Sequence, residues 1–311
     1  MAAVLIAGCG YVGNALARLL IAEGDEVYGL RRTPSQLAEG VHPIVADLSD
    51  RSTIRELPTL IDSVVYAAAP GVRSQVGGDR ADPVRDGSNR HERFGDGSVE
   101  EAYEHCYVRG LSNLLAELNA RGAPVRRLIF VSSASVYGQQ NGEWVDENSP
   151  TEPRHFRGKI MLRAEQTAQA GPFPATVIRL AGIYGPGRTN LLRKVAKGEA
   201  RVPLHPRYTN RIHRDDCAGA IAHVLGLYEP SSMYLGVDHE PATSSEVVHH
   251  LARELGVDEP LLDEDASQGE SRSRNHKRCS NARLVASGYQ FQHASFREGY
   301  RDLVQAHWRL S

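Results

Sequence analysis

Short apolar runs alternate with amphipathic stretches through the first 180 residues of the chain. The apolar runs have the length of strands, and they lie at Val4–Ala7, Glu26–Leu30, His42–Val45, Ser63–Ala68, Arg127–Ser132 and Ala175–Leu180. Helical spacing of apolar residues marks Tyr11–Glu23 and one face of Tyr103–Leu118. Because near-continuous apolar strands separated by helices are typical of a parallel sheet covered on both faces, the pattern predicts a doubly wound α/β fold.

The pattern breaks at residues 70–98 and again after Gly182. The first stretch holds six glycines and two prolines among many charges, which is typical either of a lid over a site or of a disordered loop. After Gly182 the periodic segments become short and scattered. We therefore expect a large N-terminal domain over residues 1–180 and a smaller C-terminal domain over residues 181–311. The second domain is interleaved with a late return to the sheet around Met233–Val237.

A glycine motif, Gly8-x-Gly10-x-x-Gly13, joins the first predicted strand to the first predicted helix. Gly8 permits the tight turn, Gly10 lets the backbone approach a pyrophosphate, and Gly13 lets the helix pack closely on the strand. The N-terminal amides of that helix would then face the phosphates. Since the motif follows an apolar strand and opens an amphipathic helix, it predicts a Rossmann-type dinucleotide site that includes Tyr11 and Val12.

The second strand ends in Arg31-Arg32, where an NAD-binding protein usually carries an acidic residue for the ribose 2′-hydroxyl. A carboxylate there would repel a 2′-phosphate, whereas two guanidinium groups would bind it through charge-assisted hydrogen bonds. The other interpretation is a solvated arginine pair at a strand end. The position favours NADP(H) over NAD(H) as the cofactor.

Composition limits the partners of the chain. The 311 residues carry a formal net charge of −2, which gives no electrostatic reason to expect a nucleic acid or an anionic membrane as partner. The four cysteines are scattered and the 13 histidines show no metal-ligand spacing, so we expect neither a disulfide framework nor a metal site. No apolar run approaches the roughly 20 residues that span a bilayer. These features predict a cytoplasmic protein.

Small hydroxyl side chains follow the strand at Arg127–Ser132, at the sheet edge where ligands bind in open parallel sheets. Further motifs follow in order: Asp47-Leu48, Ala67-Ala68, Ser132-Ser133-Ala134-Ser135-Val136-Tyr137-Gly138, Arg179-Leu180-Ala181-Gly182-Ile183-Tyr184-Gly185-Pro186-Gly187, Asn210-Arg211-Ile212-His213-Arg214-Asp215-Asp216 and Asn281-x-x-Leu284. With these motifs the chain resembles, over nearly its whole length, the extended branch of the short-chain dehydrogenase/reductase superfamily, the NAD-dependent epimerase/dehydratase type. The resemblance implies that Asp47 and Leu48 flank the adenine, that Ala67 and Ala68 contact the cofactor, and that the second domain receives a small-molecule substrate, often a nucleotide sugar.

The family's catalytic residues are only partly present. By the family's spacing Ser133 occupies the catalytic serine position and Lys159 that of the lysine that orients the cofactor ribose, while His155 and Tyr107 replace the tyrosine and the asparagine. An imidazole has an unperturbed pKa of about 6.5, so His155 can transfer the proton in place of the tyrosine. The alternative is that proton transfer is lost and Lys159 only binds the ribose. The first interpretation predicts hydride transfer on a hydroxyl or carbonyl substrate, and the second a non-catalytic NADP-binding sensor or partner-binding protein.

Substrate contacts are expected from Ser135 and Tyr137, and from the basic residues Arg188, Arg211 and Arg278, which predict an anionic ligand such as a diphosphate. The apolar stripe on Tyr103–Leu118 predicts a homodimer, because this helix often packs on its symmetry mate in the resembling proteins. The same stripe is also explained if it covers the sheet of its own chain.

Overall fold

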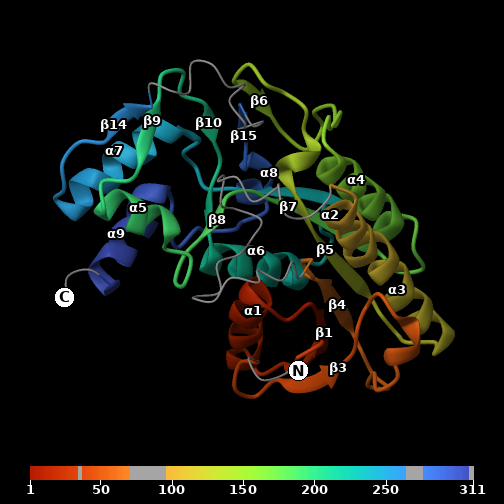
Figure 1. Ribbon diagram of the computed structural model, residues 1–311. Coiled ribbons are helices and arrows are strands. Elements are labelled where there is room, and N and C mark those ends of the chain that lie inside the picture. Colours follow the sequence, from red (N-terminus) through yellow and green to blue (C-terminus); the bar gives the residue numbers. More distant parts are fainter. Residues whose placement is uncertain (34–36, 71–95, 264–275, 308–311) are drawn as a thin grey trace.

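A seven-stranded, fully parallel sheet forms the centre of the protein (Figure 1). The computed structural model describes residues 1–33, 37–70, 96–263 and 276–307. The strand order is β12 (Met233–Gly236), β7 (Ala175–Leu180), β5 (Arg127–Ser133), β4 (Ser63–Tyr66), β1 (Ala3–Ala7), β2 (Glu26–Arg31) and β3 (His42–Val45). This order confirms the doubly wound parallel fold that the apolar pattern predicts.

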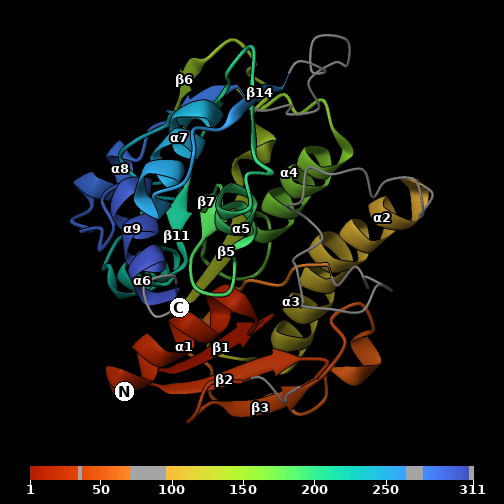
Figure 2. The ribbon, with the colours of Figure 1, turned by 60° about the vertical axis from the view of Figure 1, so that its left-hand side comes forward.

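Helices cover both faces of the sheet (Figures 1 and 2). On one face α1 (Tyr11–Ala22) packs beside α6 (Arg214–Gly226), and on the other lie α3 (Gly110–Ala120) and α4 (Phe156–Gln169). Successive side chains of β1 belong alternately to the two cores, since strand residues point to opposite faces in turn. Burial on both faces explains why the strands read as continuous apolar runs.

A smaller unit beside the carboxyl ends of the strands has its own core, built around Leu192, Val247, Leu251 and Phe296. It contains α5 (Asn190–Ala196), β9 (Arg201–Pro203), α7 (Ser244–Leu255), β14 (Leu261–Asp263) and α9 (Phe296–His307). Short strand pairs and one short helix connect the two parts: β6 (Glu143–Val145), β8 (Ile183–Tyr184), β10 (Tyr208–Thr209), β11 (Ile212–His213), β13 (Ala242–Thr243), β15 (Lys277–Cys279) and α8 (Ala282–Ala286). The chain enters this unit after β7, returns to the sheet through α6 and then β12, and re-enters the unit at α7.

A long helical segment follows the stretch predicted as a loop. Residues 71–95 of that stretch lie outside the described residues, and α2 (Asp96–Tyr103) already begins inside the predicted loop. A π-helical turn over Glu104–Arg109 joins α2 to α3. The predicted stripe on α3 (Leu111, Leu114, Leu118) is fully buried against the chain's own sheet, so it offers no apolar surface to a symmetry mate. No helix within the described ranges is long and apolar enough to cross a membrane.

A buried ion pair links α4 to the sheet. The Arg179 guanidinium on β7 donates from Nε and Nη2 to the two oxygens of Glu165 on α4, at 2.9 and 2.7 Å, and both side chains are 4% exposed. Ser132 at the end of β5 donates to the same carboxylate at 2.5 Å, and Arg179 Nη1 donates to the Tyr137 hydroxyl at 2.8 Å. Bidentate geometry of this kind is the strong form of a charge-assisted hydrogen bond.

Glu165→Gln should therefore lower the free energy of unfolding by about 3–5 kcal/mol, because it leaves the buried Arg179 charge without a counter-ion. The matched control is Glu104→Gln, which breaks the exposed pair between Glu104 and Arg163 on the outer side of the same helix. Glu104→Gln should lower the free energy of unfolding by about 1 kcal/mol or less. Urea unfolding measures the free energy of unfolding of both variants, and an equal decrease in the two would contradict a special role for the buried pair.

Candidate functional site

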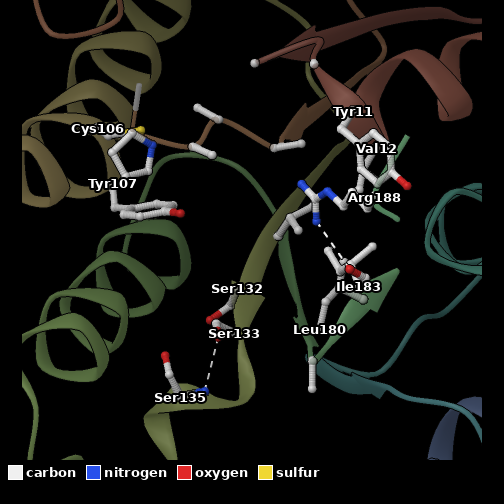
Figure 3. Close-up of a pocket in the computed structure, with 18 of the residues that line it drawn as sticks. Tyr11, Val12, Cys106, Tyr107, Ser132, Ser133, Ser135, Leu180, Ile183 and Arg188 are labelled. Atoms are coloured by element: carbon white, nitrogen blue, oxygen red, sulfur yellow. Dashed lines mark hydrogen bonds between the residues drawn. The ribbon is translucent and has the colours of Figure 1, made fainter. Parts of the chain in front are cut away.

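A cleft of about 1250 Å³ opens at the carboxyl ends of the central strands, between the sheet and the smaller unit. Figure 3 shows its centre, with Ser133 and Ser135 at the end of β5, and with Tyr107 and Arg188 reaching in from opposite sides. Ligands of open parallel sheets bind at this edge. The cleft brings the glycine-rich turn, the Arg31-Arg32 pair and the serine segment into one site.

The glycine-rich turn has the geometry that its motif predicts. Gly8 has a φ of +84°, and a Cβ there would collide with the backbone of Ala68. A Cβ on Gly13 would lie 3.1 Å from Ile6 Cγ2, so this glycine lets α1 approach β1 and does not itself line the cleft. Gly10, by contrast, lines the cleft at the N-cap of α1, where no side chain caps the helix. The Gly10 amide donates to the Gly8 carbonyl at 2.7 Å, and the absence of a Cβ at Gly10 lets a phosphate group approach the first amides of α1.

The predicted adenine and ribose side of the cofactor site also lies on the cleft. Eight of the residues predicted to bind the cofactor line the cleft: Tyr11, Val12, Arg31, Arg32, Asp47, Leu48, Ala67 and Ala68. Arg31 Nη1 donates to the carbonyl of Cys9 at 3.2 Å, which holds this guanidinium beside the glycine-rich turn. Arg32 is exposed at the rim. Burial opposes ionisation of Asp47, but hydrogen bonds from Ser49 and the Arg32 charge outweigh it and lower the pKa of the Asp47 carboxyl.

The serine segment is held in a tight turn. The Ser135 amide donates to Ser133 Oγ at 3.2 Å, and both side chains line the cleft. Tyr137 does not line it, although we expected a substrate contact there. Its hydroxyl is buried, accepts from Arg179 and donates to the Asp146 carbonyl, and burial raises its pKa to about 12. Tyr137 therefore belongs to the structural network behind the serines.

The structure does not bring His155 or Lys159 to the cleft. His155 is the N-cap of α4, Lys159 is exposed, and neither lines the site. The residues of α4 that line it are Arg157 and Met161, each two positions further along. Because each helical residue turns by about 100°, a shift of two positions moves a side chain to the opposite face. The predicted proton-transfer histidine and ribose-binding lysine thus lie on the right helix in the wrong register for this cleft.

The π-helical turn supplies His105, Cys106 and Tyr107 to the cleft. Tyr66 on β4 donates its hydroxyl to the Cys106 carbonyl, which satisfies a backbone acceptor inside the widened turn. Burial raises the pKa of the Cys106 thiol to about 12, so the thiol is protonated and a poor nucleophile at neutral pH. Of these residues the sequence indicated only Tyr107, since nothing in its periodicity marks a π-turn. Such turns occur frequently at functional sites.

Two of the three predicted substrate-binding arginines line the cleft. Arg188 lies over the Tyr11 ring, 4.0 Å from its centre, and Arg211 donates to Thr209 Oγ1 at 2.5 Å. Arg278 points away from the cleft, donates to the Gly142 carbonyl and packs on the rings of Trp144 and Tyr208.

Lys277, the residue before Arg278, faces the cleft instead, because neighbouring strand residues point to opposite sides. This lysine is 1% exposed, and its Nζ donates to the Tyr137 carbonyl at 3.2 Å. Burial lowers the pKa of the Lys277 ammonium. The sequence offered only a run of basic residues here, of which 272 and 274 lie outside the described residues.

A cluster of His213, Asp216 and His293 does not line the cleft, although the His213 ring packs edge-on against Tyr184, which does. The Asp216 carboxylate accepts from the backbone amides of Gln292 and His293 and from the Tyr289 hydroxyl, and it pairs with the His293 ring. These contacts tie the segment before α9 to the start of α6. The carboxylate is already engaged, so the cluster acts as a structural tie.

The fold and the cleft define an α/β protein with a dinucleotide site at the edge of its sheet. A family model described as NAD(P)H-binding matches residues 8–226, and the chain belongs to this family. A solved structure from Methylobacillus flagellatus, described as a candidate NAD-dependent epimerase/dehydratase, is 34% identical over 98% of both chains, with a TM-score of 0.75. Protein YeeZ of Escherichia coli strain K12 is 27% identical over 94% of this chain and 97% of its own length.

More distant solved structures share the fold. One is MoeE5 in complex with UDP-glucuronic acid and NAD, which is 20% identical over 100% of both chains, with a TM-score of 0.75. The resemblance to the NAD-dependent epimerase/dehydratase superfamily, stated above from the motifs, is confirmed by the family model and by the Methylobacillus flagellatus structure.

Proposed function

We propose that the protein is an NADP(H)-dependent oxidoreductase that exchanges hydride with a hydroxyl or carbonyl carbon of a small anionic substrate. The observation that carries the proposal is the single cleft joining the glycine-rich turn, Arg31 and Arg32 to the Ser133 turn. The amides at the start of α1 would hold the pyrophosphate, and the two arginines the 2′-phosphate. When bound, the nicotinamide would exchange hydride with a carbon of the substrate.

The cofactor preference depends on the two guanidinium groups. We expect NADPH to bind at least about tenfold more tightly than NADH, which corresponds to about 1.4 kcal/mol. Arg31→Ala with Arg32→Ala should remove most of this difference and leave NADH binding nearly unchanged, as measured by calorimetric titration. Arg278→Ala, which removes an arginine outside the cleft, is the control. Equal dissociation constants for the two cofactors in the unaltered protein would refute the preference.

The substrate oxygen needs a hydrogen-bond donor and a proton source. The Ser133 hydroxyl supplies the donor, since it faces the cleft at the end of β5. We assign the proton to Lys277, because it lines the same cleft and its ammonium sits on the carbonyl of Tyr137, within the segment that follows Ser133. In the reducing direction hydride adds to the carbonyl carbon and the ammonium gives its proton to the oxygen, so that an alcohol forms. His155 and Lys159 are not part of this proposal because neither lines the cleft.

Lys277→Met should therefore lower the reduction rate by about 10²–10⁴-fold on any carbonyl compound that the unaltered protein reduces, while NADPH binding is retained. In the unaltered protein the rate should fall as the pH rises through the pKa of Lys277, which burial places below the usual value near 10.4. Lys277→Arg should lower the rate about as much as Lys277→Met, since a guanidinium keeps its proton and cannot give it to the substrate oxygen. The exposed Lys197→Met is the control. Full activity of Lys277→Met would remove Lys277 from the reaction.

A second candidate is a non-catalytic NADP-binding sensor or partner-binding protein. It is favoured by one observation, that α4 presents Arg157 and Met161 to the cleft in place of a proton-transferring side chain. This candidate predicts tight NADPH binding without oxidation of NADPH by any member of a broad carbonyl and nucleotide-sugar panel.

The homodimer expected from the sequence stays a prediction, and light scattering tests it.

A further inference from the structure

Arg157 on α4 is a cation in the cleft whose hydrogen-bonding capacity is not used by the described part of the chain. Its Nε is buried and has no hydrogen-bond partner there. Its guanidinium carbon lies 5.5 Å from the centre of the Tyr103 ring and 5.6 Å from that of Phe156. The rings orient the guanidinium through cation–π contacts but offer it no acceptor. A buried charged donor without an acceptor is costly, which favours an acceptor supplied by a ligand.

The position of Arg157 in its helix also points to an anion. It stands in the first turn of α4, where a cation opposes the positive end of the helix dipole. That turn has no acidic residue, and the N-cap makes no side-chain hydrogen bond. A bound anion would supply the negative charge that this turn lacks.

The start of α4 lies against the serine turn. A Cβ on Gly158, the residue after Arg157, would collide with the carbonyl of Ser135. Arg157 and Ser135 both line the cleft, so the guanidinium lies at the same end as the serines. The charge around the cleft is strongly positive. Among the described lining residues Asp47 is the only carboxylate. The cations that line the cleft are Arg31, Arg32, Arg157, Arg188, Arg193, Lys194, Arg211 and Lys277.

We propose that Arg157 binds an oxyanion of the substrate, a carboxylate or a phosphate group, next to the oxygen that Ser133 holds. The inference rests on the proposed function, because it assumes that the substrate carbonyl lies at the serine end of the cleft. It names the class of substrate: carbonyl or hydroxyl compounds with an acidic group close to the reacting carbon. A guanidinium binds either oxyanion through two parallel hydrogen bonds, which a lysine cannot reproduce.

Matched pairs of carbonyl compounds test the proposal on the protein loaded with NADP⁺, which has no hydride to transfer to them during the titration. Phenylpyruvate is compared with 1-phenylpropan-2-one for the carboxylate, and dihydroxyacetone phosphate with dihydroxyacetone for the phosphate. We expect one anionic member to bind at least tenfold more tightly than its neutral partner by calorimetric titration. Arg157→Gln should weaken that binding by about ten- to a hundredfold and leave the neutral partner and NADPH unaffected. Arg157→Lys should recover only part of the loss.

Arg154→Gln is the matched control, since Arg154 is exposed just before the same helix and does not line the cleft. The pair that shows the preference identifies the carboxylate or the phosphate as the anchor. Neither pair showing a preference, or unchanged anion binding in Arg157→Gln, would overturn the inference. Failure of the proposed function is seen separately, as loss of NADPH binding or absence of hydride transfer in the unaltered protein.

Discussion

The cleft depends on the buried ion pair between Arg179 and Glu165. Its members come from β7 and α4, and through Ser132 and Tyr137 the pair also holds both sides of the serine turn. Removing two charges from water costs free energy, and the cost is offset here because each of these four contacts is a short hydrogen bond that involves a charged group. The pair fixes where α4 lies against the end of β5, and hence which of its side chains reach the site.

Charge within the cleft differs sharply from charge over the whole chain. The protein as a whole carries a formal net charge of −2, yet the charged residues in the described lining of the cleft are all cationic except Asp47. A concave site with one sign of charge raises the local concentration of ligands of the opposite sign. Part of this charge lies at the cofactor end, at Arg31 and Arg32, and part lies at the serine end, at Arg157 and Lys277. The two groups suit a cofactor phosphate and an acidic substrate in one cleft.

The sequence predicts the fold, and it identifies the residues that meet at the glycine-rich end of the cleft, because local patterns determine both. A buried parallel strand has to be apolar throughout, and the turn after β1 needs glycine at Gly8 and Gly13 whatever lies around it. The catalytic side depends on register, which composition does not determine. A slip of two residues on α4 exchanges Lys159 for Met161, and a slip of one on β15 exchanges Arg278 for Lys277. The π-helical turn and the buried role of Tyr137 arise from tertiary packing, so no local pattern predicts them.

A crystal structure of the protein with NADPH tests the central claim, that one cleft holds the cofactor and the reacting group together. The account predicts the 2′-phosphate against Arg31 and Arg32, the pyrophosphate on the amides that follow Gly10, and the nicotinamide beside Ser133. A cofactor bound with its 2′-phosphate turned away from both arginines, or with its nicotinamide distant from the serine turn, would contradict it.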